Sequence, residues 1–248
     1  MNTIVLIHGS WHDGTLWEPV AKYLRKLGAT VHCPTIAGHG PNANRNVNHA
    51  QCTESIVNYL IENDLNDIIL LGHSYGGTII SKVAEAAPER IRQLIYWNAF
   101  VLLDGENMFD NMPEAYYQLF ESLAKTSDDN TVLLPYDVWR NAFINDADEN
   151  MAQETYQKLT PEPCQPFHDR LDLKKFYQLD IPKTYLNCTE DQALPAGFWH
   201  PKMSSRLGQF KLIEMAGSHE AMFTRPEELA SKIIEAVQEM ERSPIKMI

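Results

Sequence analysis

IILLGHSYGGTIISKVAEAA, the sequence of residues 68–87, changes its pattern twice. Residues 68–71 are all apolar, which is typical of a parallel strand that is covered on both faces. Residues 72–76 match the pattern G-x-S-x-G, and residues 78–87 are predicted to form a helix that stops at Pro88. The segment therefore predicts a strand, a tight turn and a helix in immediate succession.

Similar apolar runs recur on both sides of this segment and alternate with segments of helical periodicity. They predict strands at residues 4–7, 30–33, 91–97, 184–188 and 210–215. Further helices are predicted at residues 16–27, around residues 56–61 and at residues 226–240. Alternation of this kind predicts an α/β fold, with a mostly parallel central sheet and helices on both faces.

Residues 104–179 do not follow this alternation. The segment is rich in aromatic side chains, namely Phe109, Tyr116, Tyr117, Phe120, Trp139, Phe143, Tyr156 and Phe167. We interpret it as a helical lid inserted over the carboxyl edge of the sheet, where open α/β folds bind ligands. The core then comprises residues 1–103 and 180–248, and the tail at 243–248 is expected to fray.

The charge balance excludes several classes of partner. The chain has 248 residues, a length that suits one large domain or at most two small ones. Lys and Arg number 21 against 33 Asp and Glu, which gives a net charge of −12. An acidic surface repels nucleic-acid phosphates and anionic lipid heads, so neither is an expected partner. No window approaches the ~20 apolar residues of a membrane span.

The cysteines indicate a reducing environment. Cys33, Cys52, Cys164 and Cys188 are scattered and form no CxxC pair. We expect them to be free and mostly packed thiols. Residues 1–7 lack the basic start and the long apolar stretch of a secretory leader, so a cytoplasmic location is expected.

Ser74 occupies the centre of the G-x-S-x-G pattern. A nucleophile pushed out at a strained strand-to-helix turn forces its neighbours into close backbone contact, so small residues must lie two positions to either side. The strand before the turn and the helix after it favour this interpretation. The alternative is a plain glycine turn without chemical function.

A serine hydroxyl needs an imidazole to take its proton, and the imidazole needs an acid to orient it. On this scaffold the expected chain order is Ser, acid, His. His219 lies just past the last predicted strand, and Asp191 follows the strand before it. We therefore predict His219 as base and Asp191 as acid, with Glu190 and Asp104 as rivals for the acid. The alternatives are a surface-loop histidine and a turn-forming aspartate.

Two backbone N–H groups are expected to stabilise the oxyanion. One belongs to Tyr75, after the nucleophile, and the other to Ser10, in the loop that follows the first strand. His8 and His12 are spaced like metal ligands, but they lie on a strand end and a loop rather than on one helix face. We therefore predict no metal site.

Four short segments carry a resemblance to a known family: LIHGS at residues 6–10, LGHSYGG at 71–77, CTED at 188–191 and GSHEAM at 217–222. With them the chain resembles the α/β-hydrolase superfamily, and within it the plant methylesterase and hydroxynitrile-lyase branch with its bacterial esterase relatives. The resemblance implies Ser74 as nucleophile, His219 as base, Asp191 as acid, and the amides of Ser10 and Tyr75 as oxyanion donors. It also allows a homodimer through the lid.

Two positions depart from relatives with other activities. The lyases that this sequence resembles carry a lysine directly after the catalytic histidine to steady the departing cyanide, and Glu220 stands there instead. Its negative charge disfavours lyase activity. Cofactor-free dioxygenases on this scaffold typically place a histidine after the elbow serine, where this chain has Tyr75.

The sequence thus predicts a serine carboxylic-ester hydrolase that needs no cofactor and acts through an acyl-enzyme at Ser74. Aromatic residues in and near the lid predict a small apolar or aromatic ester as substrate. The pocket candidates are Trp11, Phe120, Trp139 and Phe143. The same aromatics could instead only pack the lid onto the sheet. The alternative functions are a ligand-binding homologue with little or no turnover and, less favoured, a hydroxynitrile-type lyase.

Overall fold

A central parallel sheet organises the computed structural model, which describes residues 2–242. The strand order is β2-β1-β3-β4-β7-β8, and every neighbouring pair is parallel. The strands are β1 (Thr3–Ile7), β2 (Thr30–His32), β3 (Ile68–His73), β4 (Ile91–Trp97), β7 (Lys183–Cys188) and β8 (Lys211–Met215). The predicted α/β class is confirmed, and each predicted strand is present within one or two residues of its expected ends.

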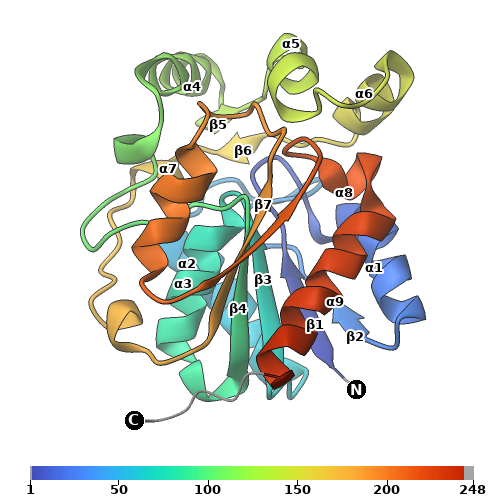
Figure 1. Cartoon of the computed structure of the whole chain (residues 1–248). Coiled ribbons are helices and arrows are strands. Elements are labelled where there is room, and N and C mark those ends of the chain that lie inside the picture. Colours follow the sequence, from blue (N-terminus) through green and yellow to red (C-terminus); the bar gives the residue numbers. More distant parts are fainter. Residues whose placement is uncertain (1, 243–248) are drawn as a thin grey trace.

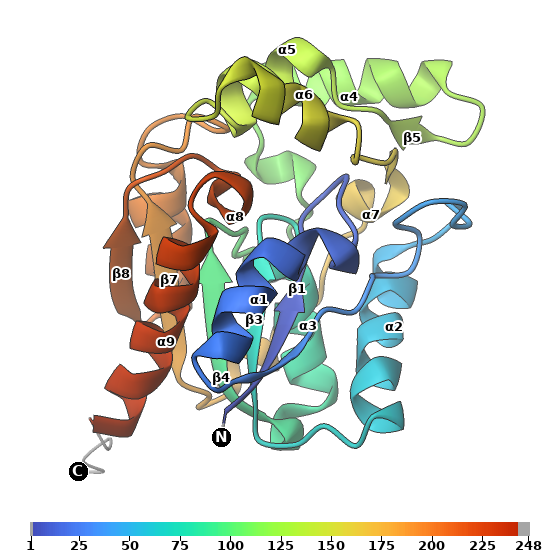
Figure 2. The ribbon, with the colours of Figure 1, turned by 90° about the vertical axis from the view of Figure 1, so that its right-hand side faces the viewer.

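Helices cover both faces of this sheet, as Figures 1 and 2 show. On one side α1 (Glu18–Lys26) packs against α9 (Pro226–Arg242), and on the other α2 (His49–Glu62) packs against α3 (Gly76–Ala86). The central strand β3 serves both layers because successive side chains point to opposite faces. Ile68 and Leu70 join the core on the α2–α3 side, whereas Ile69 and Leu71 join the core on the α1–α9 side.

A third layer lies across the carboxyl ends of the strands (Figures 1 and 2). It contains α4 (Glu114–Thr126), α5 (Tyr136–Val138), α6 (Glu149–Tyr156) and α7 (Gln165–His168). It also contains the antiparallel pair β5 (Thr131–Val132) and β6 (Glu162–Pro163), which the sequence analysis missed. Two-residue strands are too short to produce a recognisable periodicity. The lid boundaries at residues 104 and 179 stay predictions.

Three other sequence-based expectations concern the cysteines, the membrane and the tail. All four cysteines are unpaired, and Cys52, Cys164 and Cys188 are buried. Burial raises the pKa of the Cys52 and Cys164 thiols to about 12, so both stay protonated at neutral pH. None of the helices within residues 2–242 has the length and apolar character needed to cross a membrane. The tail at 243–248 lies outside the described residues.

Candidate active site

Ser74 lies in the turn between β3 and α3, at the carboxyl edge of the sheet. Its φ angle is +52°, a left-handed value that is rare for a residue with a side chain. The glycines on either side permit this turn. A Cβ atom on Gly72 would lie 2.5 Å from the Gly76 carbonyl oxygen, and one on Gly76 would lie 2.7 Å from the His8 carbonyl oxygen. The G-x-S-x-G spacing is therefore a steric requirement of this turn.

His219 and Asp191 meet beside this turn from the loops that follow β8 and β7. The Nδ1–H group of His219 donates a hydrogen bond of 2.6 Å to Asp191 Oδ2. The amide of Asn98 donates to the same oxygen, and the backbone N–H of Ala193 donates to Oδ1 at 2.8 Å. Because both carboxylate oxygens are held, Asp191 fixes the tautomer in which His219 Nε2 can accept a proton.

The two rival acids lie elsewhere. Asp104 accepts a hydrogen bond from the backbone N–H of Leu173, and Glu190 accepts one from the backbone N–H of Gly217. Neither carboxylate contacts His219 in the part of the chain that the structure describes. Asn98, which sequence analysis did not single out, completes the support of Asp191. No sequence pattern marks it, since it is an isolated residue after β4.

The surroundings of His219 favour its charged form. Burial lowers the pKa of this imidazole, but the neighbouring Asp191 carboxylate, its hydrogen bond and the charge of Glu220 act in the opposite direction. The net result is a pKa raised above the usual 6.5. The site is therefore suited to stabilise the imidazolium that forms when His219 takes a proton.

Ser74 and His219 both line one apolar cavity beneath the lid. Within residues 2–242 the Ser74 hydroxyl and the His219 ring share no hydrogen bond, and such contacts often tighten only when a substrate is bound. The cavity volume is about 30 Å³, which holds about two water molecules. An ester can therefore enter only if lining side chains move.

Three of the four predicted pocket residues, Trp11, Phe120 and Phe143, line this cavity, as Ser10 does. Trp139 does not. It is fully buried, and its indole N–H donates to the Ala152 carbonyl, so it packs the lid instead. The remaining lining residues were not among the pocket candidates: Phe100, Met108, Met112, Tyr116, Ala193, Leu194 and Trp199.

Among these additional residues, Trp199 packs directly against the His219 imidazole. Its ring stacks on the His219 imidazole with centroids 5.1 Å apart and an interplanar angle of 18°. It comes from the short helix η6 (Phe198–Met203) after β7, outside the predicted lid. Its place in the sequence therefore gave no signal for a role at the site.

The two predicted oxyanion donors have free N–H groups. Among the described residues, neither the Ser10 nor the Tyr75 backbone N–H has a hydrogen-bond partner. Ser10 also lines the cavity, and Tyr75 directly follows Ser74 at the start of α3. Both are thus available for a ligand oxygen, at the end of a helix whose dipole favours negative charge.

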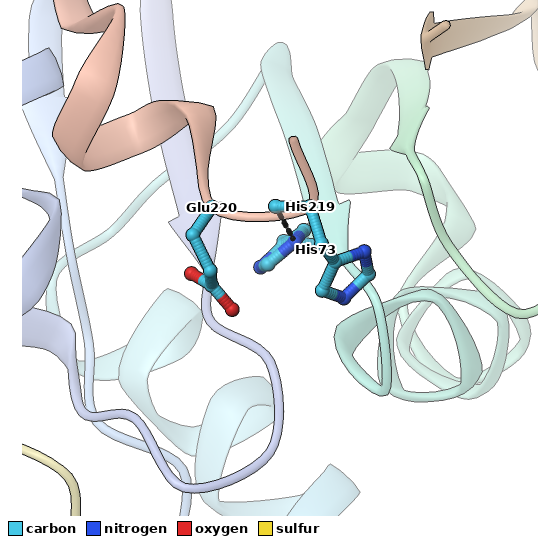
Figure 3. A group of neighbouring side chains, drawn as sticks. All are labelled: His73, His219 and Glu220. Carbon is cyan, nitrogen blue, oxygen red and sulfur yellow. Dashed lines mark hydrogen bonds between the residues drawn. The ribbon is translucent and has the colours of Figure 1, made fainter. Parts of the chain in front are cut away.

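His73, His219 and Glu220 lie close enough together to be considered as metal ligands (Figure 3). Some of their polar atoms already have other partners, whereas His73 Nδ1 and Glu220 Oε2 make no hydrogen bond within the described residues. His73 Nε2 donates to the His219 carbonyl oxygen at 3.0 Å, the dashed line in Figure 3. His219 Nδ1 is held by Asp191, and a Glu220 carboxylate oxygen lies 3.1 Å from His12 Nε2.

Comparisons with known proteins give a consistent family. A family model described as "Alpha/beta hydrolase family" matches residues 4–232. A carbendazim hydrolyzing esterase from Nocardioides sp. (strain SG-4G) is 37% identical over 118 residues, which are 46% of this chain and 49% of that protein. A pyrethroid hydrolase from Sphingobium wenxiniae is 25% identical over 93% of this chain and 85% of its own.

One solved structure is similar over nearly the whole chain. It is described as an extracellular alpha/beta-hydrolase from a Paenibacillus species that shares structural and functional homology with tobacco salicylic acid binding protein 2. It is 44% identical, covers 95% of this chain and 99% of its own, and superposes with a TM-score of 0.92.

Proposed function

This chain belongs to the alpha/beta hydrolase family, and we propose that it is a serine carboxylic-ester hydrolase that acts through an acyl-enzyme at Ser74. One observation carries the proposal. His219, which is hydrogen-bonded to Asp191 at 2.6 Å, lines the same cavity as Ser74 at its strained turn. The esterase and hydrolase names of the similar proteins support the same reaction class.

Acylation begins when Ser74 Oγ attacks the carbonyl carbon of the ester. His219 Nε2 takes the hydroxyl proton, and the Asp191 carboxylate stabilises the resulting imidazolium. The carbonyl oxygen becomes negative and accepts hydrogen bonds from the N–H groups of Ser10 and Tyr75. When the tetrahedral intermediate collapses, the alkoxide leaves with the proton from His219 as a free alcohol, and Ser74 carries the acyl group.

Deacylation repeats these steps with water as the nucleophile. His219 removes a proton from water as its oxygen attacks the acyl carbon, and the same two N–H groups stabilise the second oxyanion. Collapse breaks the bond to Ser74 Oγ, which recovers its proton from His219. The carboxylic acid is released and the enzyme returns to its starting state.

The cavity lining supports a small apolar or aromatic ester as substrate. Phe100, Phe120 and Phe143 offer apolar surfaces, and Met108 and Met112 are flexible enough to rearrange around a ligand. A surface groove of about 620 Å³ shares Tyr116, Ala193 and Leu194 with the cavity. We propose this groove as the substrate entrance.

The oligomeric state and the location stay separate proposals. A homodimer through the lid is tested by size-exclusion chromatography with light scattering, where a single 28.3 kDa species would contradict it. The cytoplasmic location is tested by cell fractionation. The Paenibacillus relative is described as extracellular. Recovery of this protein from the medium rather than from the cytoplasmic fraction would contradict the proposed location.

Replacing Ser74 tests the proposed function. We expect Ser74→Ala to lower the hydrolysis of p-nitrophenyl acetate by roughly 10³-fold or more, because only binding and the oxyanion donors remain. Labelling by a fluorophosphonate probe, which requires an activated serine, should disappear as well. The exposed Ser205 provides the control, and Ser205→Ala should keep both activities. Full activity of a folded Ser74→Ala protein would contradict the nucleophile assignment.

A further inference from the structure

The peptide group between Ser10 and Trp11 is fixed at both of its polar atoms. The Ser10 carbonyl oxygen accepts a hydrogen bond of 2.6 Å from His12 Nδ1. The Trp11 N–H donates a hydrogen bond of 2.8 Å to Glu162 Oε2. This peptide follows the peptide that carries the Ser10 N–H, so fixing it restricts the backbone angles of Ser10, a residue that lines the cavity.

Trp11 needs such support because its φ angle is +64°. A left-handed conformation costs a residue with a Cβ atom about 1–2 kcal/mol. Two residues in or near the β5–β6 pair, Thr160 and Val132, form further hydrogen bonds with Trp11. The Thr160 N–H donates to the Trp11 carbonyl oxygen, and the Trp11 indole N–H donates to the Val132 carbonyl oxygen, both at 2.9 Å.

Glu162 is fully buried, which is unusual for a carboxylate. Its oxygens also lie 3.0 and 3.1 Å from His39 Nε2, and His39 Nδ1 in turn faces the Ala37 carbonyl oxygen at 3.1 Å. Burying a carboxylate costs several kcal/mol unless its partners offset the loss of water. Both partners, Trp11 and His39, come from the amino-terminal part of the chain, whereas Glu162 belongs to β6, which pairs with β5.

We propose that Glu162 is a positioning residue that holds the Ser10–Trp11 peptide and thereby the Ser10 oxyanion donor. The strand pair above the sheet is thus a structural part of the oxyanion site as well as a cover for the cavity. The inference rests on the proposed ester hydrolysis. Since an oxyanion donor acts mainly in the transition state, loosening it lowers kcat more than it raises KM.

Two substitutions of similar size at Glu162 distinguish the effect of its hydrogen bond to the Trp11 N–H from the effect of its packing. Glu162→Leu fills the buried space but removes the acceptor for the Trp11 N–H. Glu162→Gln keeps an oxygen for that N–H and offers its NH₂ group to His39 Nε2. Glu154, an exposed residue of α6, provides Glu154→Gln as a control for the lost charge.

The measurements are kcat and KM for p-nitrophenyl acetate, with folding checked by circular dichroism and thermal melting. We expect Glu162→Leu to lower kcat on the order of 10- to 100-fold with little change in KM. We expect Glu162→Gln and Glu154→Gln to stay within about threefold of the wild type, because both keep the Trp11 contact.

Three results would overturn the positioning role. They are an unchanged kcat in folded Glu162→Leu, an equal loss of kcat in Glu162→Gln, or a loss confined to KM. If Glu162→Leu does not fold, the decision falls to Glu162→Gln and to Val132→Pro, which loosens the neighbouring strand of the pair and should also lower kcat selectively. Failure of the proposed function looks different, because the wild type itself would then neither hydrolyse the ester nor react with a fluorophosphonate.

Discussion

At the scale of single residues, the site is organised around the charge of one buried imidazole. Asp191 and Glu220 are both negative and both near His219, and they outweigh the burial that lowers its pKa. His12 opposes them. Burial lowers the pKa of His12, but Glu220 raises it on balance, and a charged His12 disfavours a charged His219. Glu220 therefore raises the pKa of the proposed base His219, whereas sequence analysis related Glu220 only to lyase activity.

This arrangement predicts the pH dependence of the reaction. The proposed mechanism requires neutral His219, so kcat/KM should rise with pH, and the raised pKa places the midpoint above 6.5. Glu220→Gln removes a negative charge beside the imidazole, so the midpoint should move to lower pH. The measurement is kcat/KM from pH 5 to 9, with Glu154→Gln as the control whose midpoint should not move. A midpoint unchanged by Glu220→Gln would contradict a net effect of Glu220 on the pKa of His219, since the same substitution also removes the carboxylate that raises the pKa of His12.

At the scale of elements, the strand–turn–helix unit of β3 and α3 depends on close backbone contact. Gly76 begins α3 against the carbonyl oxygens of Ile7 and His8 in the neighbouring strand and loop. A side chain there would push the helix away from β1. The small size of Gly76 thus lets the Ser74 turn pack closely against the segment that leads to Ser10.

We predict that Gly76→Ala destabilises the whole protein. The added Cβ atom would lie 2.7 and 2.8 Å from two backbone oxygens, which cannot move aside as a flexible side chain could. The free energy of unfolding should fall by about 3 kcal/mol, the upper range for overpacking. Urea unfolding followed by circular dichroism measures this change.

Gly105→Ala is the comparison for this experiment. Gly105 has a φ of +82° and no atom near its added Cβ, so only backbone strain is introduced. We expect it to cost about 1 kcal/mol. Equal losses in the two variants would mean that close contact at Gly76 is not the limiting factor.

At the scale of the whole molecule, the cavity lined by Ser74 and His219 lies where two layers meet. Ser74 and His219 come from the sheet edge, whereas Phe120 comes from α4 in the layer above it. The contact between these layers leaves only about 30 Å³ of space. We therefore expect the packing of the upper layer to limit the size of ester that the site accepts.

We predict that Phe120→Val shifts activity towards larger acyl groups. The ratio of kcat/KM for p-nitrophenyl hexanoate to that for the acetate should rise on the order of 10-fold, the effect of a few methylene groups in an apolar pocket. Phe109→Val is the control, because Phe109 packs on Phe167 and does not line the cavity. A similar change of ratio in both variants would argue against Phe120 as a limit on size.

Sequence analysis predicted more of the sheet than of the upper layer. Continuous apolar runs such as residues 68–71 mark buried parallel strands, and a strained turn restricts its neighbours to glycine, so both leave a local pattern. Short strands such as β5 and isolated residues such as Asn98 and Trp199 leave none. Trp139 was assigned to the pocket because aromatic side chains serve packing and binding equally well.

The sequence by itself determined the α/β class, the order of the strands along the chain and the candidates Ser74, Asp191 and His219, because each depends on a local pattern or on chain order. Only the tertiary structure decided that Asp191 rather than Asp104 or Glu190 meets His219, that Trp199 stacks on the imidazole and that Glu162 contacts Trp11. These contacts join residues far apart in the chain, and their geometry follows from how the layers pack rather than from any spacing in the sequence.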